Sequence, residues 1–335
     1  MPAAAAGVLI VGGGLAGGLL ALELASRGAR VLVLDPQPGV LAPSATAWSY
    51  GVIPGWPLAV GASRCWRALQ RRHGDLGWRP VRARLLGAPA APALLARLGV
   101  LPLAQVDAAV LLRRLPAVLA AAGVQLLPAA ALRLEPAAAG WCVALADGSR
   151  LQADQVVLAA GAACRSLWPS LPPTLQRSWA GVLQLPGRPR PALLLPGRFS
   201  RLALERRSAA LHAPAWVVDG GLVPRSGDAL LGQLSWIAPA ADLQAAAAGP
   251  EPALAEAWLR DALAGADPAL AAALRDGNGV YRQVAVAFCR DSQPLATAVD
   301  GAPGLWVFSG FSGGFAQVPL LAPQLAAAIT ASAAG

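Results

Sequence analysis

The first 35 residues alternate apolar and glycine-rich segments in a way that predicts one compact βαβ unit. Residues 7–11 are apolar and short enough for a buried strand, and a glycine-rich turn follows them. Residues 15–27 have the length of a helix and end at Gly28, which suits the left-handed position after a helix. Residues 30–34 predict a second strand that closes at Asp35. Parallel strands joined by a helix predict a sheet with helices on both faces.

The middle of the chain continues this α/β pattern. Residues 110–122 predict a helix, with Asp107 as its N-cap and Gly123 as its stop. A strand over residues 124–127 follows it. Residues 141–151 predict a β-hairpin around Asp147-Gly148.

The pattern then changes twice before the end of the chain. A further buried strand begins at Val156, after Asp154, and ends at Gly161. Residues 172–249 are rich in Pro and Gly with short apolar runs, which predicts a separate β-rich layer. The last elements expected are a broken helical stretch, two strands and a C-terminal helix, at residues 252–274, 280–288, 305–308 and 320–331.

The composition is apolar without predicting a membrane span. Hydrophobic residues make up 56% of the 335 residues, and the mean hydropathy is +0.51. Much of this content is Ala, and Gly, Pro or Arg interrupts the apolar stretches before the roughly 18–20 residues that a span needs. Residues 7–25 contain the glycine turn and have no basic residue before them, unlike a signal peptide. We therefore expect no transmembrane segment and a cytoplasmic location.

The net charge of +9 comes entirely from Arg, since the sequence contains no Lys. A GC-rich genome favours Arg, Ala, Gly and Pro codons and accounts for much of this bias. The alternative is an electropositive surface that binds nucleic acid or anionic partners. Basic residues interleaved with Trp66 and Trp78 fit that alternative, because both side-chain types stack on bases. They are Arg64, Arg67, Arg71, Arg72, Arg79, Arg82 and Arg84.

The cysteines and histidines exclude several chemistries. Cys65, Cys142, Cys164 and Cys289 are far apart, and His73 and His212 are isolated. Neither a disulfide framework nor a zinc site is expected from such spacing. We predict no metal site.

The first turn matches a dinucleotide-binding fingerprint. Gly12 permits a tight turn, Gly14 lets the backbone approach a pyrophosphate, and Gly17 lets the helix pack closely on the sheet. The following residues, Leu15 and Ala16, start a helix whose N-terminal amides favour phosphate. Asp35 lies where a carboxylate binds the adenosine ribose, and it disfavours the 2′-phosphate of NADP.

Several other segments predict cofactor contacts. Ser44 and Thr46 follow the second strand, where their hydroxyls bind phosphate or ribityl oxygens, although an ordinary Ser/Thr turn also explains them. Val124 and Gly161 are further candidates at strand boundaries. Near the C-terminus, glycines precede an apolar helix, where a planar ring can approach closely and negative charge on a reduced flavin is stabilised. The residues concerned are Gly310, Gly313, Gly314, Phe315 and Ala316.

Taken in order, these segments resemble the D-amino-acid oxidase superfamily over essentially the whole chain. The resemblance rests on the glycine fingerprint with Asp35, on residues 153–161, on residues 224–232 and on residues 290–314. It implies an FAD-binding α/β fold, Rossmann-like, with a second β-rich (α+β) substrate domain. It also implies oxidation of a carbon–nitrogen bond of an amine or amino acid by hydride transfer to flavin N5.

The chain departs from that superfamily where substrate is bound. Val286 stands where several members carry an Arg that pairs with a substrate carboxylate. Gly313 stands where glycine oxidase has a second Arg, and Gln317 is near the position of a sarcosine oxidase Lys. Cys289 is out of register with the flavin-linking Cys, so we expect noncovalent FAD. Arg282, at even spacing from Val286, is a weak replacement candidate.

The resemblance leaves the rest of the site open. Tyr50 and Gln317 join Arg282 as weak substrate-contact candidates, and the sequence provides no general base. The electron acceptor is oxygen or a quinone. We expect an FAD-binding domain made of residues 1–60, 100–172 and 290–335, and a substrate domain made of residues 61–99 and 173–289.

Three alternatives stay open from sequence alone. The C-terminal run from Phe311 also resembles the flavin domain of an enzyme that modifies the wobble uridine of tRNA, and the Arg/Trp cluster suits RNA. A flavoprotein with a degenerate substrate site, acting as a binding partner, is the second. An NAD-linked dehydrogenase is the third, but it leaves the C-terminal glycines unexplained. We favour a small-molecule amine or amino acid over nucleic acid as the substrate.

Overall fold

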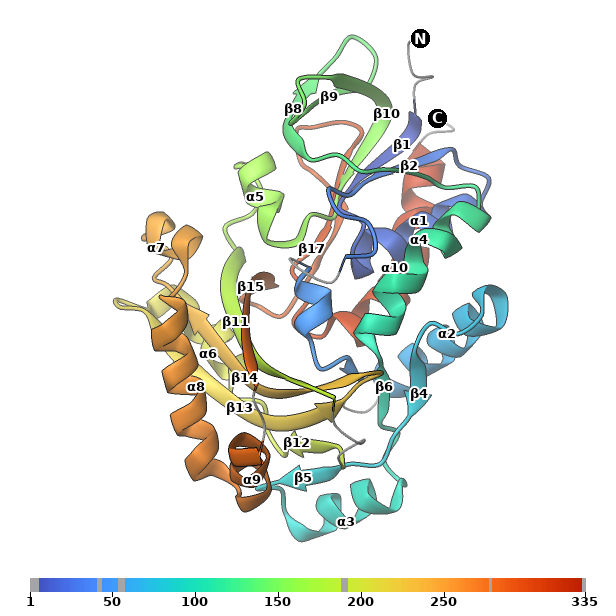
Figure 1. Cartoon of the computed structure of the whole chain (residues 1–335). Coiled ribbons are helices and arrows are strands. Elements are labelled where there is room, and N and C mark those ends of the chain that lie inside the picture. The colour runs from blue at the N-terminus through green and yellow to red at the C-terminus, as the bar shows by residue number, and fades with distance from the viewer. Residues whose placement is uncertain (1–5, 41–43, 54–57, 188–191, 277–278, 333–335) are drawn as a thin grey trace.

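The computed structural model describes residues 6–40, 44–53, 58–187, 192–276 and 279–332. The expected domain ranges 1–60, 173–289 and 290–335 therefore each include a few positions that lie outside the described residues. Residues 41–43, in the loop before Ser44, also lie outside them. The fold is mixed α/β, as expected, with a largely parallel sheet and a second, mainly antiparallel sheet (Figure 1).

The first sheet contains the predicted βαβ unit. Strands β1 (Ala6–Val11), β2 (Val31–Leu34), β7 (Gln125–Leu127), β10 (Arg150–Leu158) and β17 (Leu305–Ser309) are parallel, and β16 (Leu295–Ala298) adds an antiparallel edge. Their order is β16-β17-β10-β1-β2-β7. The central strand β1 thus has β2 on one side and β10 on the other. The carboxyl ends of strands from both ends of the chain meet at one edge of this sheet.

One face of this sheet is covered by helices. Val8 and Ile10 of β1 pack against α1 (Leu15–Ser26), α4 (Ala108–Ala121) and α10 (Gly314–Ser332) in one buried cluster. Asp107 caps α4 as predicted, because its Oδ1 accepts hydrogen bonds from Ala109 N and Val110 N.

The expectation of helices on both faces was wrong, because a β-hairpin covers most of the opposite face. Leu9 and Val11 of β1 pack there against Trp141 and Val143 of a β-hairpin and against residues around the short helix α5 (Cys164–Leu167). The hairpin consists of β8 (Ala131–Pro136) and β9 (Trp141–Leu145), and β9 pairs with the first half of β10. The second hairpin strand expected up to residue 151 and the strand expected from Val156 form one continuous strand, because β10 pairs with β9 and then continues beside β1.

The C-terminal helix begins at Gly314, six residues before the predicted start at Leu320. Pro319 and Pro323 lie inside it, so the helix continues through two residues that lack the backbone N–H of a regular helix. This helix is the one in the described residues that is long and apolar enough to cross a membrane. It packs in the interior against α1 and α2 (Leu58–His73), with one face buried. Its apolar character is therefore explained by core packing.

The second sheet forms the β-rich layer expected in residues 172–249, extended at both edges. Its order is β15-β11-β14-β13-β12-β5. The strands are β5 (Arg84–Leu86), β11 (Leu175–Pro186), β12 (Leu194–Pro196), β13 (Ala215–Pro224), β14 (Asp228–Ile237) and β15 (Val280–Cys289). Leu183, Leu231 and Leu234 pack against α8 (Pro252–Ala266) and α9 (Pro268–Asp276) on one face. The other face is directed toward the first sheet.

The remaining elements connect the two sheets. A three-stranded sheet has the order β3-β6-β4, from β3 (Val52–Ile53), β4 (Trp78–Pro80) and β6 (Ala104–Val106). Helices α3 (Ala90–Leu98), α6 (Arg201–Arg207) and α7 (Leu243–Ala248) complete the fold. The sequence pattern did not predict α2, α3 or α6, because their short apolar runs are interrupted by Arg and Pro.

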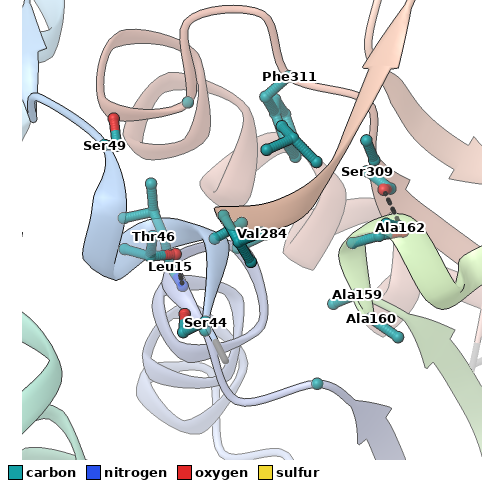
Figure 2. Close-up of a pocket in the computed structure, with 18 of the residues that line it drawn as sticks. Leu15, Ser44, Thr46, Ser49, Ala159, Ala160, Ala162, Val284, Ser309 and Phe311 are labelled. Carbon is teal, nitrogen blue, oxygen red and sulfur yellow. Dashed lines mark hydrogen bonds between the residues drawn. The ribbon is translucent and has the colours of Figure 1, made fainter. Parts of the chain in front are cut away.

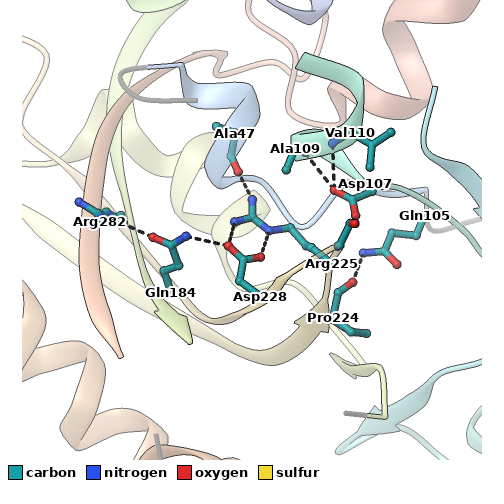
Figure 3. Close-up of polar contacts among 11 residues, drawn as sticks. Ala47, Gln105, Asp107, Ala109, Val110, Gln184, Pro224, Arg225, Asp228 and Arg282 are labelled. Atoms are coloured by element: carbon teal, nitrogen blue, oxygen red, sulfur yellow. Dashed lines mark hydrogen bonds and ion pairs between the residues drawn. The ribbon is translucent and has the colours of Figure 1, made fainter. Parts of the chain in front are cut away.

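A polar cluster fixes the segment Ala45–Trp48 to the second sheet (Figure 3). Arg225 is buried, forms a two-point ion pair with Asp228 and donates to the Ala47 carbonyl oxygen. Its guanidinium also lies 5.6 Å from the centre of the Trp48 ring. The burial and pairing indicate a structural role for Arg225, because an unpaired buried charge would be costly.

Candidate functional site

A cavity of about 1190 Å³ lies between the two sheets. It is lined by the glycine turn after β1, by residues 44–52, by the end of β10, by β15 and by the loop that leads into α10. Figure 2 shows Leu15, Thr46, Val284 and Phe311 around this space. Segments almost 300 residues apart in the sequence therefore form one site.

The glycine turn has the shape that its sequence predicts. Gly12 has φ +110°, and a Cβ there would lie 2.5 Å from the Ala159 carbonyl oxygen of the neighbouring strand. A Cβ on Gly17 would overlap the Gly12 carbonyl oxygen. Gly12 lines the cavity, whereas Gly17 lies behind the turn and permits close packing of the helix.

Helix α1 begins at this turn and presents its N-terminus to the cavity. Gly14 is its N-cap and provides no side-chain capping bond. Leu15 N donates to Thr46 Oγ1 at 3.4 Å, so the Thr46 hydroxyl lies at the helix start (Figure 2). Leu15, Ala16, Ser44 and Thr46 all line the cavity. A helix N-terminus with adjoining hydroxyls is suited to a phosphate group.

Asp35 occupies the end of β2 beside the glycine turn. Its Oδ1 accepts a hydrogen bond from Gln37 N at 3.0 Å, and a Cβ on Gly13 would lie 2.5 Å from its Oδ2. The absence of a side chain at Gly13 therefore leaves room for this carboxylate, which lines the cavity. This is the arrangement by which a carboxylate accepts ribose hydroxyls.

The C-terminal glycine loop closes the other end of the cavity. Gly310 has φ +84° and lies against Cys289, and Gly313, Gly314, Phe315 and Ala316 line the cavity with it. Ser309 Oγ donates to the Gly161 carbonyl oxygen at 3.4 Å, which joins this loop to the end of β10. Helix α10 then points its N-terminus at the cavity, a place that stabilises negative charge.

The weak substrate-contact candidates have different surroundings. Tyr50 and Gln317 line the cavity, but the Gln317 amide oxygen accepts from Gly313 N at 3.0 Å and so caps α10. Arg282 is not among the lining residues; it donates to Gln184 Oε1 (Figure 3). Its guanidinium also lies over the Trp48 ring. Val124 is buried behind the sheet and does not line the cavity.

Neither Tyr50 nor Cys289 offers a free base beside the cavity. Burial raises the pKa of Tyr50 well above its ordinary value, and the nearby Asp219 raises it further. The Tyr50 hydroxyl donates its proton to the Asp219 carbonyl oxygen at 3.2 Å. Burial also raises the pKa of Cys289 to about 11. No cysteine is among the described residues that line the cavity.

The Arg/Trp cluster does not form a stacking platform. Trp66 is fully buried against α10, and Arg67 covers the Trp78 ring at 5.7 Å. Arg79 donates to Gln105 Oε1, and Arg84 pairs with Asp267. The exposed members of the cluster are therefore surface arginines without the exposed aromatic partners that base stacking needs.

The cavity also contains residues that the sequence analysis missed. Arg177, Arg201 and Arg206 line it, as does Ser312 of the C-terminal loop. Arg201 and Arg206 belong to α6, which no periodic pattern indicated. Ser312 could have been found from the sequence, because it lies between Gly310 and Gly313 in the predicted glycine loop. In the described residues, no cluster of three or more His, Cys, Asp or Glu side chains is arranged to hold a metal ion.

The residues present fit a long dinucleotide with a planar ring at one end. One cavity is lined by glycines that leave space where a Cβ would lie, by a carboxylate after β2 and by two helix N-termini. This is the combination expected for FAD, with its adenosine near Asp35 and its ring near the C-terminal loop.

Comparison with solved structures supports the same fold. Glycine oxidase from Geobacillus kaustophilus is 18% identical with a TM-score of 0.69, covering 97% of this chain and 94% of its own. Iminodiacetate oxidase from Chelativorans sp. BNC1 is 17% identical with a TM-score of 0.70, covering 97% and 95%. L-Amino acid deaminase from Proteus myxofaciens, solved with anthranilate, is 14% identical with a TM-score of 0.69, covering 98% and 91%.

At these low identities the solved structures show only the fold, and the family is shown by a match to a family model. None of the curated proteins compared matches the chain. The model of the DAO family, described as FAD dependent oxidoreductase, matches residues 7–101 and 82–328. The chain therefore belongs to the DAO family of FAD-dependent oxidoreductases, and its cofactor is FAD.

Proposed function

We propose that this protein oxidises a carbon–nitrogen bond of a small amine or amino acid. The observation that carries the proposal is the single cavity, in which the dinucleotide-binding turn at one end of the chain and the glycine loop at the other face the same space. The neighbouring folds are named for oxidation or deamination of amino and imino acids, which supports this substrate class. When bound, the flavin supplies the redox chemistry by accepting a hydride at its N5 atom.

The chain's own residues bind the cofactor and exclude water. The amides of Leu15 and Ala16 and the hydroxyls of Ser44 and Thr46 are placed for the pyrophosphate and ribityl oxygens. Asp35 is placed for the ribose hydroxyls. On the second sheet, Val284, Val286 and Ala287 provide an apolar wall that keeps water away from the ring.

Noncovalent attachment of FAD agrees with the cysteine positions. Cys164 and Cys289 are buried, and neither they nor Cys65 and Cys142 are among the described lining residues. A flavin linkage through sulfur needs a cysteine at the ring. We therefore propose that denaturation releases the flavin intact.

We propose that the residues around the substrate bind and orient it and that none of them acts as a base. Tyr50 keeps its proton near neutral pH, because burial raises its pKa and its one O–H is shared between the Asp219 and Gly221 carbonyl oxygens. We propose that the substrate enters with a neutral amine and that solvent takes the proton. The acceptor of the reducing equivalents is oxygen or a quinone, and the expected location is the cytoplasm.

The proposed division into domains follows the two sheets. The strands of the first sheet come from residues 6–34, 125–158 and 295–309, and most strands of the second come from residues 175–289. The segment 61–99 contributes to both regions, since α2 packs on α10 while β5 joins the second sheet. We propose that this segment bridges the two sheets rather than forming a unit of its own.

An absorbance spectrum of the purified protein, followed by anaerobic addition of amines and amino acids, tests the function. Flavin bands that bleach with one compound would support it and identify the substrate. A flavin-loaded protein that no amine or amino acid reduces would favour the binding-partner alternative. A colourless protein that does not take up added FAD would contradict the proposal.

A further inference from the structure

We infer that helix α3 and the turn after it dock the protein on the surface of a membrane that contains anionic lipid. The α3 surface consists of the apolar residues Leu94, Leu95, Leu98 and Val100 and of the adjoining Arg82 and Arg97. None of these six is among the described residues that line the cavity. The inference is therefore independent of the proposed oxidation, and it rests on apolar exposure combined with charge.

Exposed apolar side chains are concentrated on α3. Leu94, Leu98 and Val100 are 51%, 54% and 64% exposed, and Leu95 is 38% exposed. Eleven large hydrophobic residues are exposed in the described part of the chain, and these four lie within seven consecutive positions. Single apolar residues scattered over a surface are normal, whereas a concentration of them marks a site of interaction.

Helix α3 is held so that this apolar side faces solvent. The spacing i, i+3, i+4, i+7 places four exposed residues on one face of the helix, namely Ala91, Leu94, Leu95 and Leu98. Ala96, on the other side, is fully buried, and its carbonyl oxygen accepts from Ala83 N at 3.4 Å. Helix α3 also lies at the opposite end of the molecule from the hairpin of β8 and β9 (Figure 1). This position lets the helix lie flat on a membrane.

The chain around the apolar stripe is positively charged. Residues 76–106 contain four Arg and neither Asp nor Glu. Arg82 and Arg97 are exposed, and neither forms an ion pair with the described residues. The Arg82 side chain lies against Gly99, at the C-terminal end of α3. The neighbouring acid, Asp267, is already paired with Arg84 at 2.7 Å.

An apolar stripe flanked by unpaired arginines is complementary to anionic lipid. A helix at such a surface buries its apolar face at the boundary of headgroups and acyl chains, while its cations stay among the phosphates. The net charge of +9 adds a longer-range attraction. A second copy of the chain is a poorer occupant, because a twofold contact would bring Arg82 and Arg97 of both copies together without an acid.

Flotation of the FAD-loaded protein with lipid vesicles tests the inference. Vesicles of phosphatidylcholine and phosphatidylglycerol in equal parts are compared with vesicles of phosphatidylcholine alone. We expect binding to the anionic vesicles to be at least roughly tenfold tighter and to weaken as salt is raised. A native protein that binds neither kind of vesicle, or binds both equally, would overturn the inference.

The double substitution Leu94→Gln with Leu98→Gln tests the apolar stripe. Both side chains are exposed, so the fold should persist while binding to anionic vesicles weakens roughly tenfold or more. The matched control is Leu243→Gln with Leu254→Gln, since these leucines of α7 and α8 are 68% and 47% exposed. The control should bind as the native protein does. Native-like binding by the α3 variant would place the contact elsewhere and contradict the inference.

The double substitution Arg82→Gln with Arg97→Gln tests the charges. At low salt, binding to anionic vesicles should weaken roughly tenfold, and its dependence on salt should become shallower. Arg30→Gln with Arg114→Gln removes the same net charge from exposed positions outside the α3 surface. This control should retain most of the binding. An equal loss in the two variants would mean that net charge alone attracts the protein, and the docking surface would be refuted.

Two further measurements identify what covers α3. Hydrogen exchange of the backbone amides in residues 90–100 should slow when anionic vesicles are added, and unchanged exchange there would contradict the inference. Sedimentation without vesicles examines the second copy: a native dimer that Leu94→Gln with Leu98→Gln separates would assign the surface to self-association instead of lipid. Amine oxidation is measured in solution without vesicles, so failure of the proposed function and failure of membrane docking are distinguishable.

Discussion

The indole Nε1–H of Trp66 donates a 2.8 Å hydrogen bond to the carbonyl oxygen of Phe315, and the two rings stack with their centres 6.3 Å apart. In an uninterrupted helix, the amide four residues later would take this oxygen, but that residue is Pro319 and has no N–H. The proline thus frees a carbonyl that a tryptophan of α2 satisfies. The contact fixes the first turn of α10, which follows the glycine loop of the site.

Trp66→Phe tests this relationship. The substitution keeps one aromatic ring but leaves a small cavity and a buried carbonyl oxygen without its donor, so we expect a loss of at least about 1–3 kcal/mol in the free energy of unfolding. Denaturant titration measures it. Trp78→Phe is the control: the Trp78 indole nitrogen has no hydrogen-bond partner among the described residues, so the change should be small. A Trp66→Phe protein as stable as the native one would contradict the account.

Asp35→Asn should weaken FAD binding. The amide keeps the volume and an oxygen for Gln37 N but loses the charge that accepts ribose hydroxyls, a change of about 1.5–3 kcal/mol, or roughly 10- to 100-fold in Kd. Quenching of flavin fluorescence by apoprotein measures the affinity. Asp300→Asn, at an exposed turn, should leave it unchanged. Equal affinities of native and Asp35→Asn protein would exclude the assigned role.

Gly17→Ala should damage both stability and FAD binding. Its Cβ would overlap the Gly12 carbonyl oxygen, so α1 must move away from the turn, at a cost of about 1–3 kcal/mol or more. Gly265→Ala is the opposite case, since it lies in α8 with no atom within 4 Å of the new Cβ. That control should stabilise the protein by up to about 1 kcal/mol. Thermal unfolding with and without FAD distinguishes the two outcomes.

Glu205 should make stability depend on pH. Burial raises the pKa of its carboxyl, a shift that Arg201 and the Ser312 hydrogen bond only partly oppose. Above the ordinary Glu pKa the unfolded chain releases this proton while the folded chain keeps it. The stabilising contribution of Glu205 is therefore complete below that pKa and is lost as pH rises through the higher pKa of the folded state.

Glu205→Gln should remove this dependence. Between about pH 4.5 and neutrality, the Tm of the native protein should fall more steeply than that of the variant, whose amide oxygen still accepts from Ser312. Glu256→Gln, on the partly exposed face of α8, controls for the loss of a carboxylate elsewhere. Parallel Tm curves for native and Glu205→Gln protein would show that the buried carboxyl has no such effect.

The residues proposed to hold the cofactor could be selected from the sequence because they act through local backbone geometry. Gly12, Gly14 and Asp35 follow strands at fixed spacing, and a tight turn between a strand and a helix has few solutions. Thirteen of the fifteen predicted cofactor residues line the cavity; Gly17 and Val124 do not. Gly17 still fulfils the packing role that its spacing predicted.

The substrate half depends on contacts between distant segments, which no local pattern encodes. Arg282 has the right spacing on β15, yet Gln184 and Trp48 hold it outside the lining residues. Arg201 lies in an unremarkable stretch, yet Asp219, Glu205 and Ser312 hold it beside the C-terminal glycine loop. The start of α10 was missed for the same reason, because the donor that makes Pro319 acceptable comes from Trp66.

The sequence by itself determined the βαβ unit and the two glycine turns, since these follow from short-range sterics and helix electrostatics. FAD as the cofactor followed from the resemblance of these segments to a known family. The tertiary structure decided which side chains meet in the cavity and which apolar helix is buried. Those outcomes depend on burial and on hydrogen bonds between residues as far apart as Trp66 and Phe315.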